Sequence, residues 1–220
     1  ITLDVDDADS IATAARQVAA AHGRLDILVN NAGILRDDMG RKPSEQSLAA
    51  WRATFETNLF AVVAVTQAFL PLLHKSAAGR IVNVSSILGS IALHADPASP
   101  IYDFKVPAYN VSKTAVNAWT VQLAHELRDT RIKVNAVHPG YVKTDMNAGE
   151  GELETRPDGM ALHEGHGVDP HRVVVGGPQD DGAVCHGLVE PAGVLLIDLA
   201  DELLKVFLLH NSKPTAIRRG

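Results

Sequence analysis

A tyrosine and a lysine stand four positions apart, Tyr109 and Lys113 in the run YNVSK. In a helix this spacing places both side chains on one face, where they can touch. A tyrosine hydroxyl has an ordinary pKa of about 10, so acid–base work near neutral pH requires the phenolate to be stabilised by about 3–4 kcal/mol. A neighbouring ammonium supplies a charge of the right sign. The pair suits proton transfer, although helices also carry such pairs by chance.

Two adjacent serines, Ser85 and Ser86, end the apolar run GRIVNVSS shortly before that helix. At the carboxyl end of a strand in a parallel sheet, one hydroxyl could donate a hydrogen bond to a substrate carbonyl. The alternative interpretation is that either serine caps a helix or forms a turn. Because ligands bind at this edge of such sheets, the other strand ends, at Asp4, residues 30–33 and residues 139–142, are also candidate site positions.

The elements that must position these residues alternate between short apolar strands and longer helices. We expect strands at residues 1–5, 25–29, 80–85 and 132–137, with a further possible strand at 172–175. Helices are expected at about 10–21, 47–75 and 108–127, the first capped by Asp9 or Ser10 and ended by Gly23. This alternation is typical of an α/β fold with a doubly wound parallel sheet.

Composition excludes several classes of function. The net charge is −6 and no Lys/Arg run stands beside an aromatic platform, so nucleic-acid binding is not expected. The single cysteine, Cys185, fits a reducing compartment, and a cytoplasmic protein is expected. Residues 1–10 lack the pattern of a signal peptide. Residues 194–209 carry a polar stripe that indicates an amphipathic helix and not a membrane span.

Five short runs occur in the order found in one enzyme family. They are NNAG at 30–33, Asn58 in FETNLF, GRIVNVSS, YNVSK, and PGYVKT at 139–144. With these runs the chain resembles the short-chain dehydrogenases/reductases, which have a Rossmann-like sheet. The loop ADPASPIYDFKVP at 95–107 is similar to an insertion in carbonyl-reductase-like members, and suggests a shaped substrate entrance.

The resemblance implies a role for each matching position. Tyr109 would be the general acid in reduction, and Lys113 would lower the pKa of Tyr109 and bind the nicotinamide ribose. Ser86, in preference to Ser85, would hold the substrate oxygen. Asn58 would support a water molecule that relays protons. The alternative interpretation of Asn58 is a structural residue that kinks the helix and is satisfied by backbone groups. The implied cofactor-binding residues are Asp4, Val5, Asn31, Ala32, Gly33, Tyr109, Lys113, Pro139, Gly140, Val142 and Thr144.

One family feature has no counterpart in the sequence: the glycine-rich turn that binds the cofactor's diphosphate at a helix N-terminus. The chain is therefore expected to be an N-terminally truncated member that lacks the first strands of the sheet. Those strands would pair with residues 25–29, so an exposed apolar edge at 27–29 is expected. Residues 1–147 are interpreted as a partial catalytic domain and 148–220 as an atypical C-terminal segment, for which two interpretations stay open: a loop of the fold, or sequence foreign to it.

Two functions remain open. The first is an oxidoreductase that transfers hydride between NAD or NADP and a small-molecule carbonyl or secondary alcohol. The resemblance implies a homo-oligomer built through helices 47–75 and 108–127. No nucleic-acid or membrane partner is expected. The second is a non-catalytic truncated homologue that cannot hold the dinucleotide. A metal site is not expected, because the spacing of the candidate ligands matches no tight template. These candidates are His163, His166, His171, Cys185 and His186.

Overall fold

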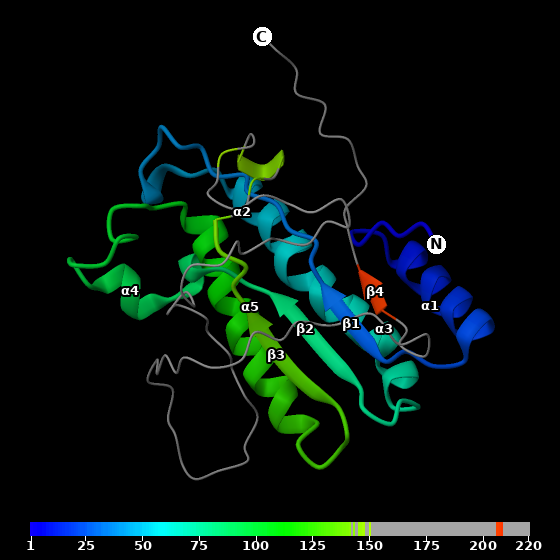
Figure 1. Ribbon diagram of the computed structural model, residues 1–220. Coiled ribbons are helices and arrows are strands. Elements are labelled where there is room, and N and C mark those ends of the chain that lie inside the picture. The colour runs from blue at the N-terminus through cyan, green and yellow to red at the C-terminus, as the bar shows by residue number, and fades with distance from the viewer. Residues whose placement is uncertain (142, 144, 148–149, 151–205, 209–220) are drawn as a thin grey trace.

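A computed structural model describes residues 1–141, 143, 145–147, 150 and 206–208. The described strands form one parallel sheet in the order β3-β2-β1-β4 (Figure 1). Their bounds are β1 Ile27–Asn30, β2 Arg80–Val84, β3 Lys133–Val137 and β4 Val206–Leu208. Apolar residues dominate these strands, as in parallel sheets that are covered by helices. The sheet confirms the predicted α/β fold class.

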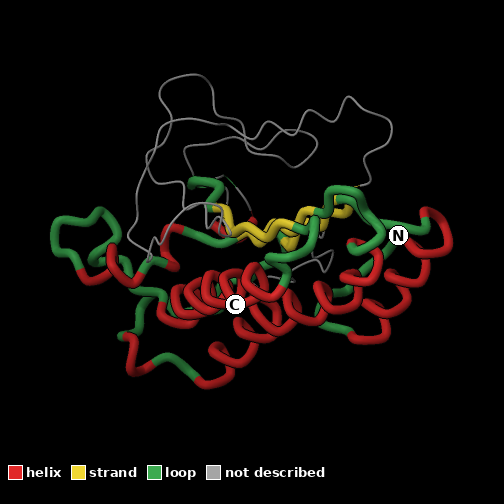
Figure 2. The backbone as a smooth tube through the Cα atoms, turned by 90° about the horizontal axis from the view of Figure 1, so that it is seen from below, coloured by secondary structure: helices red, strands yellow, loops and turns green. Residues whose placement is uncertain are grey.

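The long helices pack together on one face of this sheet (Figure 2). The described helices are α1 Ala8–His22, α2 Leu48–Phe55, α3 Ala61–Leu73, α4 Ile91–Ala95 and α5 Pro107–Glu126. Phe69 and Val65 of α3 are fully buried with Leu28 of β1 and Ile81 of β2. The stretch Leu48–Leu73 is long and apolar enough to cross a membrane, but 50% of its most apolar window is buried, which is the pattern of a core helix.

A buried chain of polar side chains ties the two central strands to the helices above them. Asn30 of β1 donates from Nδ2 to Thr66 Oγ1 of α3 at 3.0 Å and to Asn83 Oδ1 of β2 at 2.8 Å. Asn83 in turn donates to Thr120 Oγ1 of α5 at 2.9 Å. These groups lie in a low-dielectric interior, where a satisfied hydrogen bond fixes geometry and a broken one is costly. The network therefore sets how α5 sits on the sheet.

The N-terminal segment differs from its prediction. Residues 1–5 form no strand in the described structure, although Leu3 and Val5 are buried in the core. Helix α1 is capped by Asp7, whose carboxylate accepts from Asp9 N at 2.9 Å, so the predicted caps Asp9 and Ser10 are wrong. Asp9 and Ser10 lie inside the first turn of the helix, where the Ser10 hydroxyl accepts from Asp4 N. Gly23 ends the helix with φ 72°, as predicted.

The apolar edge of β1 is covered by a strand from the C-terminal segment. β4 pairs with β1 in parallel, with Ile27 opposite Val206 and Val29 opposite Leu208. The prediction that residues 27–29 form an exposed edge is therefore wrong. The backbone N–H and C=O groups of an edge strand pair readily with another extended segment, and here β4 is that segment. The predicted helix at 194–209 is also wrong at its described residues. The possible strand at 172–175 and the candidate metal ligands lie outside the described residues.

Candidate active site

Tyr109 and Lys113 lie one turn apart on α5, as the sequence predicts. Lys113 Nζ is 5.6 Å from the centre of the Tyr109 ring, and it donates a hydrogen bond to Val84 O at the end of β2 at 2.8 Å. The lysine is 3% exposed, and burial lowers its pKa from 10.5 to about 8. Among the described residues Val84 O is the acceptor for this ammonium, so N–H groups remain for a ligand.

The two serines after β2 take different partners. The expected lowering of the Tyr109 pKa by Lys113 is wrong in this structure, because burial raises that pKa and only the Ser86 side chain partly offsets the rise by favouring the phenolate. Ser85 instead donates to the backbone oxygen of Lys113 at 3.3 Å and is buried. The structure thus brings Ser86, Tyr109 and Lys113 together, and leaves Ser85 to attach the strand end to α5.

A glycine that the sequence analysis did not single out sets the distance between Ser86 and α5. Gly89 ends the short 3₁₀ helix η3, Ile87–Gly89, and its carbonyl accepts from Thr114 Oγ1 at 3.0 Å. A Cβ added at Gly89 would lie 2.9 Å from the backbone carbon of Lys113 and 3.0 Å from Asn117 Nδ2. No side chain fits there without moving η3, which carries Ser86, away from the helix.

We predict that Gly89→Ala destabilises the fold by about 1–3 kcal/mol, the usual cost of overpacking. The measurement is the urea midpoint of unfolding at constant m-value. The matched control is Gly40→Ala, because a Cβ at Gly40 would meet only Asp38 Oδ1 at 3.4 Å. Equal midpoints for the two variants would show that η3 moves without cost.

Asn58 is held in a π-helical turn, η2 Glu56–Phe60, between α2 and α3. It is fully buried; its Oδ1 accepts from Ile34 N at 2.7 Å, and its Nδ2 donates to Ile34 O at 2.9 Å and to Ser112 Oγ at 3.0 Å. Such π turns interrupt the i→i−4 ladder and are frequent at functional sites. These contacts fit the structural interpretation of Asn58, and its role in a proton relay stays a prediction.

The cofactor turn, residues 31–33 that the resemblance assigns to the cofactor, ends at Gly33 close to Asn58 and Lys113. A Cβ there would lie 3.5 Å from both Asn58 Oδ1 and Lys113 Nζ, and 3.8 Å from Met146 Cε. The missing side chain leaves room beside the ammonium, which fits a ribose held against backbone. The observed geometry therefore suits the nicotinamide half of a dinucleotide.

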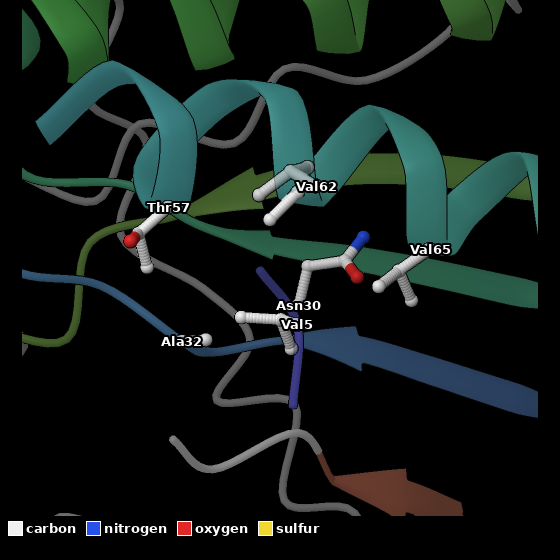
Figure 3. A pocket seen from close by; sticks show the side chains of 7 residues that line it. Val5, Asn30, Ala32, Thr57, Val62 and Val65 are labelled. Carbon is white, nitrogen blue, oxygen red and sulfur yellow. The ribbon is translucent and has the colours of Figure 1, made fainter. Parts of the chain in front are cut away.

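The other predicted cofactor residues fall into two groups. Val5 and Ala32 line one small pocket between β1 and α3 (Figure 3), whose remaining lining is Asn30, Thr57, Ala61, Val62 and Val65. Asp4 Oδ1 accepts from Asp6 N at 3.1 Å, while Asn31 is partly exposed. This pocket is mostly apolar and belongs to the core under the cofactor turn.

The turn after β3 forms the second group. Gly140 has φ 86°, in the region that favours glycine, and its N–H donates to His138 Nδ1 at 3.2 Å. Pro139 lies beside it, and the following 3₁₀ helix, Asp145–Asn147, brings Met146 near Gly33. Val142 and Thr144 lie outside the described residues. The chain thus returns from β3 toward the cofactor turn.

Comparisons with known proteins agree with this geometry. The family described as short chain dehydrogenase matches residues 1–154. The short-chain dehydrogenase anuI of Penicillium roqueforti is 40% identical over 174 residues, which cover 75% of this chain and 68% of that protein. The 3-oxoacyl-[acyl-carrier-protein] reductase FabG of Thermotoga maritima is 38% identical over 144 residues, covering 66% of this chain and 53% of its own.

Solved structures give the same result. The NADPH-bound carbonyl reductase from chicken fatty liver aligns with a TM-score of 0.61 and 27% identity, covering 74% of this chain and 75% of that one. A short chain dehydrogenase from Shigella flexneri, complexed with NADP, aligns with a TM-score of 0.56 and 32% identity, and the alignment covers 67% of this chain and 57% of that one. NAD or NADP therefore fits as the cofactor. The chain spans about half to two thirds of the length of the curated relatives it matches, and it belongs to the short-chain dehydrogenase family.

Proposed function

We propose that the protein is an oxidoreductase that moves hydride between NAD or NADP and the carbon of a small carbonyl compound or secondary alcohol. The observation that carries the proposal is the placement of the Tyr109 ring 5.6 Å from the buried ammonium of Lys113, which donates to Val84 O at the carboxyl end of β2, with Ser86 next to the tyrosine hydroxyl. When bound, the reduced nicotinamide supplies the hydride.

The chain's own groups supply proton and orientation. In reduction the Tyr109 hydroxyl donates its proton to the substrate oxygen, and the Ser86 hydroxyl donates a hydrogen bond to the same oxygen. Two donors that converge on one oxygen stabilise the negative charge that develops there. Lys113 stabilises the Tyr109 phenolate that remains, and its other N–H groups are placed to hold a ribose hydroxyl near Gly33.

Exposed apolar side chains on the long helices support the proposal of a homo-oligomer. Leu48 and Phe60 are 67% and 54% exposed on the α2–α3 stretch, and Val111 is 46% exposed on α5. A contact between two copies of the chain through these helices would cover such side chains. The family resemblance favours contact through these same helices.

The competing proposal, a non-catalytic homologue, rests on the absence of a glycine-rich diphosphate turn from residues 1–220. Both proposals can be tested with an extended protein, in which the first strands, helix and glycine-rich turn of a relative precede residue 1. We expect the extended protein to consume NADPH or NADH with a panel of ketones and aldehydes. Residues 1–220 alone should bind either nucleotide with a Kd above about 1 mM, worth only about 4 kcal/mol.

The readouts are nicotinamide absorbance for turnover and nucleotide fluorescence for binding. An extended protein that folds and binds nucleotide without turning over any carbonyl would favour the non-catalytic proposal. A micromolar Kd for residues 1–220 would show that another segment of this chain replaces the glycine-rich turn.

A further inference from the structure

Asp37 holds the start of the helix that carries Tyr109. Its Oδ1 accepts from Ala108 N at 2.8 Å and its Oδ2 accepts from Tyr109 N at 3.0 Å, contacts that join positions 71 and 72 residues apart. The carboxylate is 8% exposed. Each of its oxygens thus binds one backbone N–H of the first helical turn.

These two N–H groups have no partner within the helix itself. A helix leaves its first N–H groups without intrahelical acceptors, and a side chain at the N-cap usually satisfies them. Here the N-cap is Val106, which has no side-chain acceptor, and Pro107 has no N–H. The first backbone N–H of α5 that bonds within the helix is that of Asn110, which donates to Val106 O at 2.8 Å. Asp37 therefore supplies the whole cap from a distant segment.

The segment that presents Asp37 is fixed on both sides. Asn58 binds both backbone groups of Ile34, as described above. Gln46 accepts from Asp38 N at 2.9 Å and donates to Asp38 O at 2.7 Å. The carboxylate thus stands in a short rigid stretch that begins at the Gly33 turn, and a negative charge at a helix N-terminus is favourable in its own right.

We propose that Asp37 is a positioning residue for proton transfer: it fixes the backbone of Tyr109 relative to the Gly33 turn, and so holds the phenol against Ser86. The inference rests on the proposed function for its catalytic consequence, and on the contacts of Asp37 for its structural part. If the first turn of α5 loses this cap, the Tyr109 hydroxyl moves relative to Ser86. Displacements of about 1 Å can cost about a hundredfold in rate.

Asp37→Asn is the sharpest test, because it keeps the shape but removes the charge and one acceptor. The matched control is Asp38→Asn, which removes the neighbouring carboxylate; Asp38 is exposed and pairs with Arg41 at 3.0 Å. Tyrosine labelled with carbon-13 at Cζ reports on the hydroxyl of residues 1–220 without any turnover. The chain has only three tyrosines, and Tyr109→Phe assigns the signal of interest.

We expect Asp37→Asn to displace the Tyr109 signal in the direction that Ser86→Ala displaces it, and Asp38→Asn to leave it in place. In the extended protein, Asp37→Asn should lower kcat about 10- to 100-fold with little change in KM. An unmoved Tyr109 signal, or a displaced signal with unchanged kcat, would overturn the proposal. If Asp37→Asn does not fold, Asp37→Glu keeps the charge on a longer arm and should give a smaller displacement.

The two proposals fail separately. A parent extended protein without turnover, together with a Tyr109 signal that Asp37→Asn still displaces, would refute the proposed function and support the contact between Asp37 and the catalytic helix.

Discussion

Tyr109→Phe in the extended protein should lower carbonyl reduction by about two to four orders of magnitude, the usual range for the loss of a positioned acid or base. The change removes one hydroxyl and little volume, so nucleotide binding should survive. The structure supplies the reason: the Tyr109 ring lies 5.6 Å from the Lys113 ammonium, and its hydroxyl is next to Ser86. Steady-state kinetics with either nucleotide measures the fall.

Tyr102→Phe is the matched control for this variant. Tyr102 lies seven residues earlier in the loop before α5, where Lys105 Nζ stands 5.1 Å from its ring centre. Because Tyr102 belongs to the loop 95–107 that is similar to a substrate-entrance insertion, the same loss of a hydroxyl there should act on KM and leave kcat within a factor of about two, whereas Tyr109→Phe lowers kcat itself. Near-full carbonyl reduction by Tyr109→Phe would mean that the family resemblance describes the fold without the mechanism.

The parts of the fold and site that sequence predicted well depend on short-range patterns. The spacing of Tyr109 and Lys113 follows from helical geometry alone, and α5 runs over Pro107–Glu126 where residues 108–127 were expected. The runs at 80–85 and 132–137 became β2 and β3 because their β-branched and small apolar residues alternate between a buried and a less buried face. Ser86 was predicted from its place two residues after the end of β2.

The features that sequence did not predict depend on contacts between distant segments. Asp37 has no local motif, and its role is visible only when residues 108 and 109 are placed beside it. Gly89 matters because Lys113 packs against it. At the N-terminus, Asp7, Asp9 and Ser10 are all good cap residues, so residue type alone does not choose among them; the structure has Asp7 as the cap and Ser10 bonded to Asp4 N.

Lys113→Met should raise the stability of residues 1–220 at neutral pH while it abolishes the proposed activity. Burial lowers the pKa of Lys113 from 10.5 to about 8, so at pH 7 the folded chain carries a buried charge that the unfolded chain leaves in water. The shift corresponds to about 3 kcal/mol, against which losing the hydrogen bond to Val84 O costs about 1 kcal/mol. A net gain of about 2 kcal/mol is expected from urea unfolding at pH 7.

The pH dependence of this gain identifies its cause. Between pH 8 and 10.5 the unfolded chain holds the Lys113 proton and the folded chain releases it, so the unfolding free energy of the parent chain rises with pH in that window. The advantage of Lys113→Met should therefore be full below pH 8 and shrink as the pH rises toward 10.5. Lys75→Met, which replaces an exposed lysine, should show no such trend.

Turnover tests the proposed role of the same buried charge beside the proton donor. In the extended protein Lys113→Met should lose at least as much activity as Tyr109→Phe, since it removes the charge that favours the phenolate and the donor for the ribose. Stability bought by removing a functional charge is the expected trade-off at an active site. A variant that is less stable at pH 7, or one that keeps its activity, would show that Lys113 is a structural lysine held by Val84.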